Sequence, residues 1–277
     1  MKHVVSFSGG LCSFWAAHRV ISKFGPADVV LLFADTLMED EDLYRFLGDA
    51  CRVLQVPVTR IADGRTPWQL FTDQHMMGNS RVDLCSRILK RDLLHSWFRT
   101  NCDITTDVLY LGIDWTEDHR LLRSRKRLPD WKIEAPMCEP PLWNKCQMIK
   151  ELKTLGIEPP RLYSYGFPHN NCSGFCVKAG QAQFALLLKS FPEKYAWHEA
   201  QEEQFRAQVG KNVSILRDRR GGQVRPLSLR EFRSWVEAGK YDHHEWGGCG
   251  CAVDVDDTEL SPLQEQTTLP SVEETTA

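Results

Sequence analysis

The stretch VVSFSGGLCSFWAAHRV, residues 4–20, decides the fold. It opens with a short apolar, β-branched run, which is typical of a buried parallel strand. After two glycines, Phe14, Ala17 and Val20 recur at helical spacing. Residues 8–13, Ser-Gly-Gly-Leu-Cys-Ser, therefore join a strand to a helix.

The same alternation continues along the chain. Residues 28–34 and 56–62 are strand-like, and helical patterns cover 13–24 and 39–54. This order predicts an α/β fold with a doubly wound, mostly parallel sheet. Further patterns predict a strand at 107–113 and helices at 86–99, 143–155, 178–190, 193–209 and 228–238.

Composition divides the 277 residues into three parts. We expect a nucleotide-type core at 1–165 and a helical, cysteine-bearing C-terminal region at 166–253. Residues 254–277 carry seven acidic groups and no Lys or Arg, so we expect a disordered tail. The net charge is −3, which leaves +4 on the other 253 residues.

The glycine turn follows the carboxyl end of the first strand, where parallel α/β sheets bind ligands. Glycines let backbone amides approach an anion, and the next helix presents its positive end. The spacing matches neither a Walker A loop nor a GxGxxG fingerprint. A plain strand-to-helix connection explains the turn equally well.

Several motifs in order resemble one family. They are Ser-Gly-Gly-x-x-Ser, LFADTLMEDEDLYRF, DLCSRILKRDLL, YLGIDWTEDHR, PPLWNKCQMIKELKTLGIEPPRLYSYGF and HNNCSGFCVKAGQ. Together, over about residues 3–190, they resemble the phosphoadenosine phosphosulfate (PAPS) reductase-like family of the PP-loop, or N-type ATP pyrophosphatase, superfamily. That superfamily has an adenine nucleotide alpha hydrolase-like fold.

The resemblance implies roles for particular residues. Ser8, Gly9, Gly10 and Ser13 would hold phosphate or sulfate oxygens, and Asp35 would lie near the nucleotide or its Mg²⁺. Lys90, with Arg91 beside it, would add positive charge, as would Arg120. Ser8, Ser13, Asp35 and Lys90 are the predicted catalytic residues. Asp35 with Thr36 also suits a helix N-cap, and Lys90 and Arg91 also suit a solvated helix face.

Three residues in two segments depart from the family's pattern. Leu11 and Cys12 stand where Lys and Asp are usual, and Asp114 stands where Arg follows Gly-Ile. The absent lysine removes a charge that would face the β- and γ-phosphates. Binding of an adenine nucleotide is therefore better supported than cleavage of ATP.

The cysteines form two close pairs, Cys172 with Cys176 and Cys249 with Cys251. The resemblance implies a [4Fe–4S] cluster held by Cys85, Cys172, Cys176 and one of Cys249 or Cys251, since four thiolates are usual. Two alternatives stay open. The two pairs suit a structural zinc site, and Cys249 with Cys251 also suits a redox pair. The remaining cysteines are expected to be packing residues: Cys12, Cys51, Cys102, Cys138 and Cys146.

Two basic segments, 119–127 and 217–225, interrupt the otherwise mixed charge pattern. The first follows the predicted strand at 107–113, and the second contains two glycines that suggest a hairpin-like turn. Arginines bind phosphates well, so these segments suit the backbone of a nucleic acid. We expect the substrate that accepts the transferred group to be a nucleic acid or a small molecule. A solvated basic helix explains the first segment equally well.

These observations predict an enzyme that binds ATP and acts at its α-phosphate, adenylating an acceptor for sulfur transfer or a related modification. The alternatives are a thiol-dependent reductase of adenylyl sulfate or PAPS that releases sulfite, and a non-catalytic nucleotide or nucleic-acid binding protein. The sulfur or electron donor stays open. No apolar run approaches the roughly 20 residues of a membrane span, so no membrane partner and a cytoplasmic location are expected.

Overall fold

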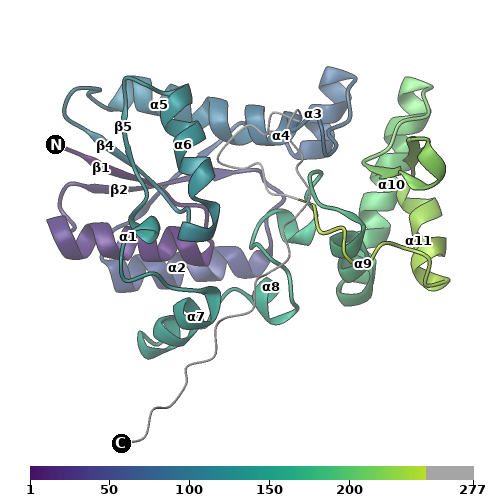
Figure 1. The fold of residues 1–277 in the computed structure, drawn as a ribbon. Coiled ribbons are helices and arrows are strands. Elements are labelled where there is room, and N and C mark those ends of the chain that lie inside the picture. Colours follow the sequence, from purple (N-terminus) through teal and green to yellow (C-terminus); the bar gives the residue numbers. More distant parts are fainter. Residues whose placement is uncertain (248–277) are drawn as a thin grey trace, which may run out of the picture.

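Five parallel strands form the centre of the structure, a computed structural model that describes residues 1–247. The strands are β1 (His3–Ser6), β2 (Val29–Asp35), β3 (Val58–Ala62), β4 (Val108–Leu111) and β5 (Lys132–Glu134). Their order is β3-β2-β1-β4-β5, and Figure 1 shows helices on both sides of them. The predicted doubly wound α/β sheet is confirmed.

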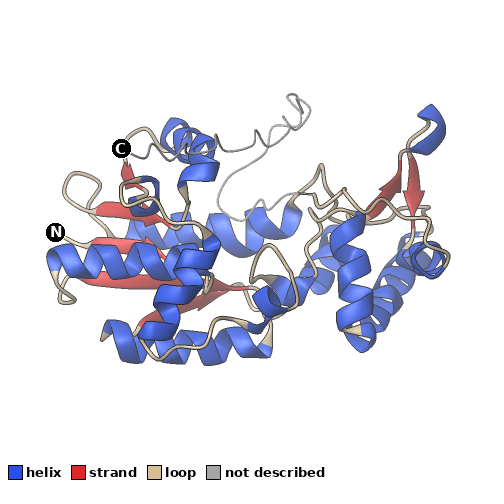
Figure 2. Ribbon diagram, turned by 60° about the horizontal axis from the view of Figure 1, so that its bottom comes forward, coloured by secondary structure: helices blue, strands red, loops and turns tan. Residues whose placement is uncertain are grey.

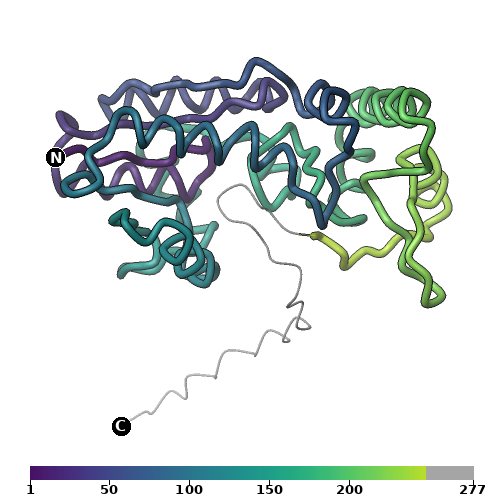
Figure 3. Tube along the Cα trace, turned by 90° about the horizontal axis from the view of Figure 1, so that it is seen from above, coloured from purple at the N-terminus to yellow at the C-terminus, as the bar shows by residue number. Residues whose placement is uncertain are grey.

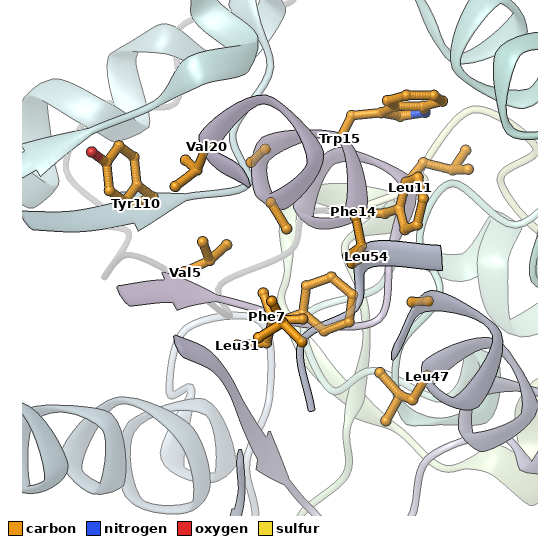
Figure 4. Close-up of a cluster of buried hydrophobic side chains, with 14 of the residues drawn as sticks. Val5, Phe7, Leu11, Phe14, Trp15, Val20, Leu31, Leu47, Leu54 and Tyr110 are labelled. Atoms are coloured by element: carbon orange, nitrogen blue, oxygen red, sulfur yellow. The ribbon is translucent and has the colours of Figure 1, made fainter. Parts of the chain in front are cut away.

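Successive side chains of a strand point to opposite sides of the sheet. Because the strands are apolar throughout, both faces of the sheet are apolar and both are covered by helices. Val5 of β1 and Phe7, the residue after β1, pack with Phe14 of α1 (Leu11–Phe24) and with α2 (Glu41–Leu54) and α7 (Lys145–Thr154). Figure 4 shows these side chains converging. Val4 faces the other way, toward α5 (Leu93–Asn101) and α6 (Asp118–Arg127).

The connection from β3 to β4 holds four consecutive helical segments. They are α3 (Pro67–Gln74), α4 (Leu84–Ser86), the π-helical segment η1 (Arg87–Asp92) and α5. The helix expected at 86–99 is therefore present, but its middle is wound more widely than an α-helix. The short turns η2 (Trp115–Glu117) and η3 (Pro136–Cys138) follow β4 and β5.

A second helical unit follows the sheet, beyond the carboxyl ends of its strands (Figure 2). It contains α8 (Arg161–Ser164), η4 (Cys172–Gly174), α9 (Gln181–Ser190), α10 (Pro192–Val209), β6 (Leu216–Asp218), η5 (Arg220–Gly222), β7 (Arg225–Leu227) and α11 (Leu229–Glu237). β6 and β7 pair antiparallel, which confirms the turn expected at 217–225. Trp68, Phe71 and Leu89 belong to the same hydrophobic cluster as this unit.

Ion pairs also join the helical unit to the sheet domain. The buried carboxylate of Asp40, at the start of α2, contacts Arg161 at 2.7 Å and Lys194 of α10 at 2.8 Å. In the trace of Figure 3 this unit, in green and yellow, lies at the side of the molecule away from the N-terminus. None of the helices within residues 1–247 is long and apolar enough to cross a membrane. The predicted tail, 254–277, lies outside the described residues.

Candidate functional site

A pocket of about 300 Å³ opens at the carboxyl ends of β1 and β4. β1 pairs with β2 on one side and with β4 on the other, so the chain reverses its direction of winding between β1 and β4. In doubly wound sheets this switch point is where ligands bind. Residues 6–8 from the end of β1 and 111–114 from the end of β4 line the pocket.

The glycine turn forms one wall of this pocket. Of the four residues that the resemblance offers as a phosphate or sulfate site, Ser8, Gly10 and Ser13 line it and Gly9 does not. Gly9 has a φ of +74°, a conformation that glycine adopts without strain. Gly10 precedes α1 without a side-chain cap, and its N–H donates to Ser13 Oγ at 3.2 Å. The start of α1 thus lies beside the pocket, where its first N–H, that of Leu11, donates to the Tyr163 hydroxyl at 3.3 Å.

Two neighbouring segments fix the position of this turn. A Cβ on Gly112 would lie 2.6 Å from the backbone nitrogen and Cα of Ser13, so only glycine fits there. From the other side, Asn170 Nδ2 donates to the carbonyl of Gly9 at 2.9 Å. The segment that carries Cys172 and Cys176 therefore begins in direct contact with the glycine turn.

Charged side chains of both signs line the pocket. Lys90, Arg120 and Lys145 are the cations, and Asp114 and Glu117 are the carboxylates. Arg120 pairs with Glu117 at 2.7 Å, and Lys145 Nζ donates to the carbonyl of Pro168 at 2.8 Å. Lys90 and Arg120, which the resemblance offers as positive charges, therefore both line this pocket.

Cys12 also lines the pocket, and its thiol lies 3.5 Å from Asp114 Oδ2. Burial and the charge of Asp114 raise the pKa of the Cys12 thiol to about 12, while Lys145 acts in the opposite direction. Cys12 is therefore a neutral thiol at physiological pH. It is unsuited to act as a nucleophile.

Asp35 lies at the end of β2 but does not line the pocket. Its fully buried carboxylate accepts hydrogen bonds from Arg60 Nε at 2.7 Å and from the Tyr44 hydroxyl at 3.0 Å. It also accepts from the N–H of Leu37 at 2.7 Å. These contacts give Asp35 a structural role in joining β2 to β3 and α2.

A second, much smaller cavity, of about 10 Å³, adjoins the first. Cys85, Cys172 and Cys176 all line it, although Cys85 lies 87 residues before Cys172 in the chain. Lys90 lines both this cavity and the pocket. The three cysteines that the resemblance groups as cluster ligands thus line one cavity. Lys90 lies between this cysteine cavity and the pocket, since it lines both.

Glu39 connects the residues between the two spaces. Its buried carboxylate accepts from Lys90 Nζ at 3.0 Å and from the hydroxyl of Thr36 at 3.0 Å. Its other oxygen accepts from the backbone N–H of Cys172. One carboxylate therefore positions both the ammonium of Lys90 and the start of the cysteine turn.

Aromatic side chains support the cysteine turn from behind. The ring of Phe175 stacks on His198 with centroids 3.6 Å apart, and Trp68 Nε1 donates to His198 Nδ1 at 3.0 Å. Burial lowers the pKa of His198 to about 3, so the ring is neutral and accepts this bond. Phe175 itself lines the cysteine cavity, and the stack fixes its position.

The other cysteines differ from one another. Cys51, Cys102 and Cys138 are half-buried, but Cys146 is exposed on α7, so its prediction as a packing residue is wrong. Cys249 and Cys251 lie outside the described residues. Within residues 1–247, no group of three or more His, Cys, Asp and Glu side chains is arranged to hold a metal ion.

The two basic segments have different surroundings. In 217–225, Arg220 and Arg225 pair with Asp218, and Arg219 pairs with Glu245. In α6, His119, Arg123 and Lys126 are exposed, with no ion pair to another described residue. Within the described part of the chain, the α6 segment is therefore the less neutralised of the two.

Three residues of the site were not singled out from the sequence: Lys145, Tyr163 and Glu39. Tyr163 accepts from the N–H of Leu11 at 3.3 Å, 152 residues away in the chain. The resemblance covers the segments that hold these residues, but each contact depends on how distant segments pack. No protein-family model matches the chain, and a search of curated proteins found no significant match.

Proposed function

We propose that the protein is a PAPS reductase-like PP-loop enzyme that binds ATP in the switch-point pocket and transfers its adenylyl group to an acceptor, with a cysteine-bound iron–sulfur cluster beside the pocket. The observation that carries this proposal is the position of Lys90, which lines both the pocket and the cysteine cavity. A positive charge placed there acts on an anionic ligand on one side and on thiolates on the other.

The pocket supplies groups suited to this reaction. An oxygen of the acceptor would attack the α-phosphorus, the bond between that phosphorus and the bridging oxygen of the β-phosphate would break, and pyrophosphate would leave. The positive end of the α1 dipole and the cations of the pocket would stabilise the negative charge that builds on the phosphates. Mg²⁺ would arrive with the nucleotide and neutralise part of its charge. A sulfur nucleophile would then displace AMP from the acceptor.

The cysteine cavity suits a soft metal centre. Thiolates are the ligands that iron–sulfur clusters require, and Cys85, Cys172 and Cys176 would supply three. Gly247 pairs with Ala179, three residues after Cys176. In the sequence, Cys249 and Cys251 follow Gly247 by two and four residues, and one of them would be the fourth ligand. The bound cluster would supply electrons or hold sulfur for transfer.

Two measurements on anaerobically purified protein test this proposal. We expect visible absorbance together with about four iron and four sulfide per chain, lost in Cys85→Ser and kept in Cys51→Ser. A colourless protein that contains zinc would favour the structural zinc site. With labelled ATP, Mg²⁺ and acceptor we expect pyrophosphate. Sulfite release from adenylyl sulfate or PAPS would favour the reductase, and binding without turnover the non-catalytic protein.

We further propose that the acceptor is a nucleic acid that approaches over α6. Arg120 of this helix lines the pocket, and the exposed cations of α6 continue away from it. Trp115, which is 43% exposed, stands between the pocket residues Asp114 and Thr116 and offers a stacking surface for a base. A polyanion is the ligand that complements this helix.

Binding of a fluorescent single-stranded oligonucleotide, measured as a function of salt, tests this acceptor class. We expect Arg123→Ala with Lys126→Ala to weaken binding and to reduce the salt dependence by roughly one unit of slope per phosphate contact. Arg219→Ala, in the neutralised hairpin, is the control and should change neither. Equal binding by wild type and the α6 variant would favour a small-molecule acceptor.

A further inference from the structure

The glycine turn carries no basic residue, yet the pocket it lines is proposed to bind a polyanion. Three cations and two carboxylates line the pocket. Lys90 contacts the carboxylate of Glu39 and Arg120 contacts that of Glu117, so the charge of each is partly neutralised by a carboxylate. The net positive charge that the pocket offers to an anion therefore depends on its third cation.

Lys145 is the third cation, and its surroundings differ. It is exposed at the first position of α7, and within residues 1–247 its hydrogen-bond partner is a neutral carbonyl, that of Pro168 at 2.8 Å. An ammonium has three donors, so a second partner can be added without breaking this bond. No described carboxylate competes for it.

The position of Lys145 also relates it to the glycine turn. Its charge acts on the thiol of Cys12, in the second position of α1. Its bond to Pro168 joins it to the segment 168–171, which lines the pocket and contacts Gly9 through Asn170. Lys145 thus lines the same pocket as the turn, from the start of α7.

From this geometry we infer that Lys145 binds the phosphates of the nucleotide, supplying from α7 the positive charge that the glycine turn lacks. The inference rests on the proposed nucleotide function and assigns the phosphate contact to one further residue. The start of α7 itself contributes little, because its capping box occupies the N–H of Gln147 with Asn144 Oδ1 at 2.9 Å.

Equilibrium binding to the full chain in Mg²⁺ tests the inference with ATP, adenosine and inorganic pyrophosphate. We expect Lys145→Met to weaken ATP and pyrophosphate binding by about tenfold or more, the loss typical of a charge-assisted hydrogen bond. Adenosine binding should stay the same. Lys145→Arg should retain most of the affinity, and Lys150→Met, exposed on the same helix but away from the pocket, should match wild type.

The outcomes separate the two proposals. If wild type prefers ATP to adenosine and Lys145→Met keeps that preference, the inference is wrong and the nucleotide function stands. If wild type binds neither ATP nor adenosine, the nucleotide function fails. Pyrophosphate binding that depends on Lys145 would then still support an anion-binding role, whereas absent or unchanged pyrophosphate binding would overturn it. Thermal unfolding of each variant checks that it is folded.

Discussion

Lys90 Nζ lies 3.0 Å from Glu39 Oε1, and both side chains are nearly excluded from solvent, at 11% and 1% exposure. Breaking a buried pair leaves one charge without compensation, which typically costs about 3–5 kcal/mol. We therefore expect Glu39→Gln to lower the free energy of unfolding by about 3 kcal/mol in urea titrations. Glu41→Gln, exposed at the first position of α2 two residues later, should change it by less than about 0.5 kcal/mol.

The pair itself is tested by a double-mutant cycle. Glu39→Gln combined with Lys90→Met removes both charges and should be less destabilised than the sum of the two single variants. A strictly additive result would show that the two charges do not interact in the folded protein.

Gly112 lies against the backbone of Ser13, so its substitution tests the glycine turn. Gly112→Ala places a methyl group 2.6 Å from two backbone atoms and must displace the turn. We expect it to destabilise the protein by about 2 kcal/mol and to abolish nucleotide binding. Gly48→Ala, in an open position of α2, should instead stabilise by about 0.5–1 kcal/mol. Wild-type nucleotide affinity in Gly112→Ala would show that the turn is not part of the site.

The thiol of Cys12 should resist alkylation. Burial and Asp114 raise the pKa of Cys12 to about 12, and only the thiolate reacts. At pH 8, iodoacetamide should label the exposed Cys146 at least tenfold faster than Cys12, measured by mass spectrometry of tryptic peptides. Asp114→Asn should lower the pKa of Cys12 and raise its labelling rate. Equal labelling of both cysteines in the wild type would contradict the packing described here.

His198 should make the protein sensitive to acid. Burial lowers its pKa from 6.5 to about 3, so between these values the unfolded chain binds a proton that the folded protein does not. Stability therefore falls as pH drops from 6.5, by up to about 1.4 kcal/mol per pH unit from this group. His198→Gln should remove that part of the slope, whereas the exposed His119→Gln should not. Parallel slopes in all three proteins would refute the prediction.

Glu202 should make the protein less stable as the pH rises, the opposite of the effect of His198. Its carboxylate accepts from the N–H groups of Ile215, at 3.0 Å, and Leu229, and burial raises its pKa from 4.5 to about 7. The folded protein holds this proton between those values, so stability falls as pH rises through them. Glu202→Gln should lose this slope and destabilise the fold by about 2 kcal/mol. Glu203→Gln, at the half-buried neighbouring position, should keep the pH dependence of stability and should not destabilise the fold.

The order of most strands and helices could be predicted from sequence because each of these elements carries its own periodicity, but β5 and α3 were not predicted. The pairing of β4 with β1, which creates the switch point, could not, because it depends on which apolar faces pack together over a long separation. The meeting of Cys85 with Cys172 and Cys176 was predicted only through a resemblance. The carboxylate of Asp35 could not be placed, because Arg60 contacts it from a strand 25 residues later.

The wide turns of η1 have a consequence for the spacing along this segment. Cys85 precedes η1 and lines the cysteine cavity. Lys90 lies within η1 and lines both the cavity and the pocket, and Leu94 follows η1 and lines the pocket. A π-helical turn amounts to one extra residue in an α-helix. Its removal would rotate everything beyond it by about 100° relative to Cys85. The π-helical turn thus lets the thiol of Cys85 and the ammonium of Lys90 face the same cavity. A one-residue deletion in η1 should turn one of them away from it and leave the sheet intact.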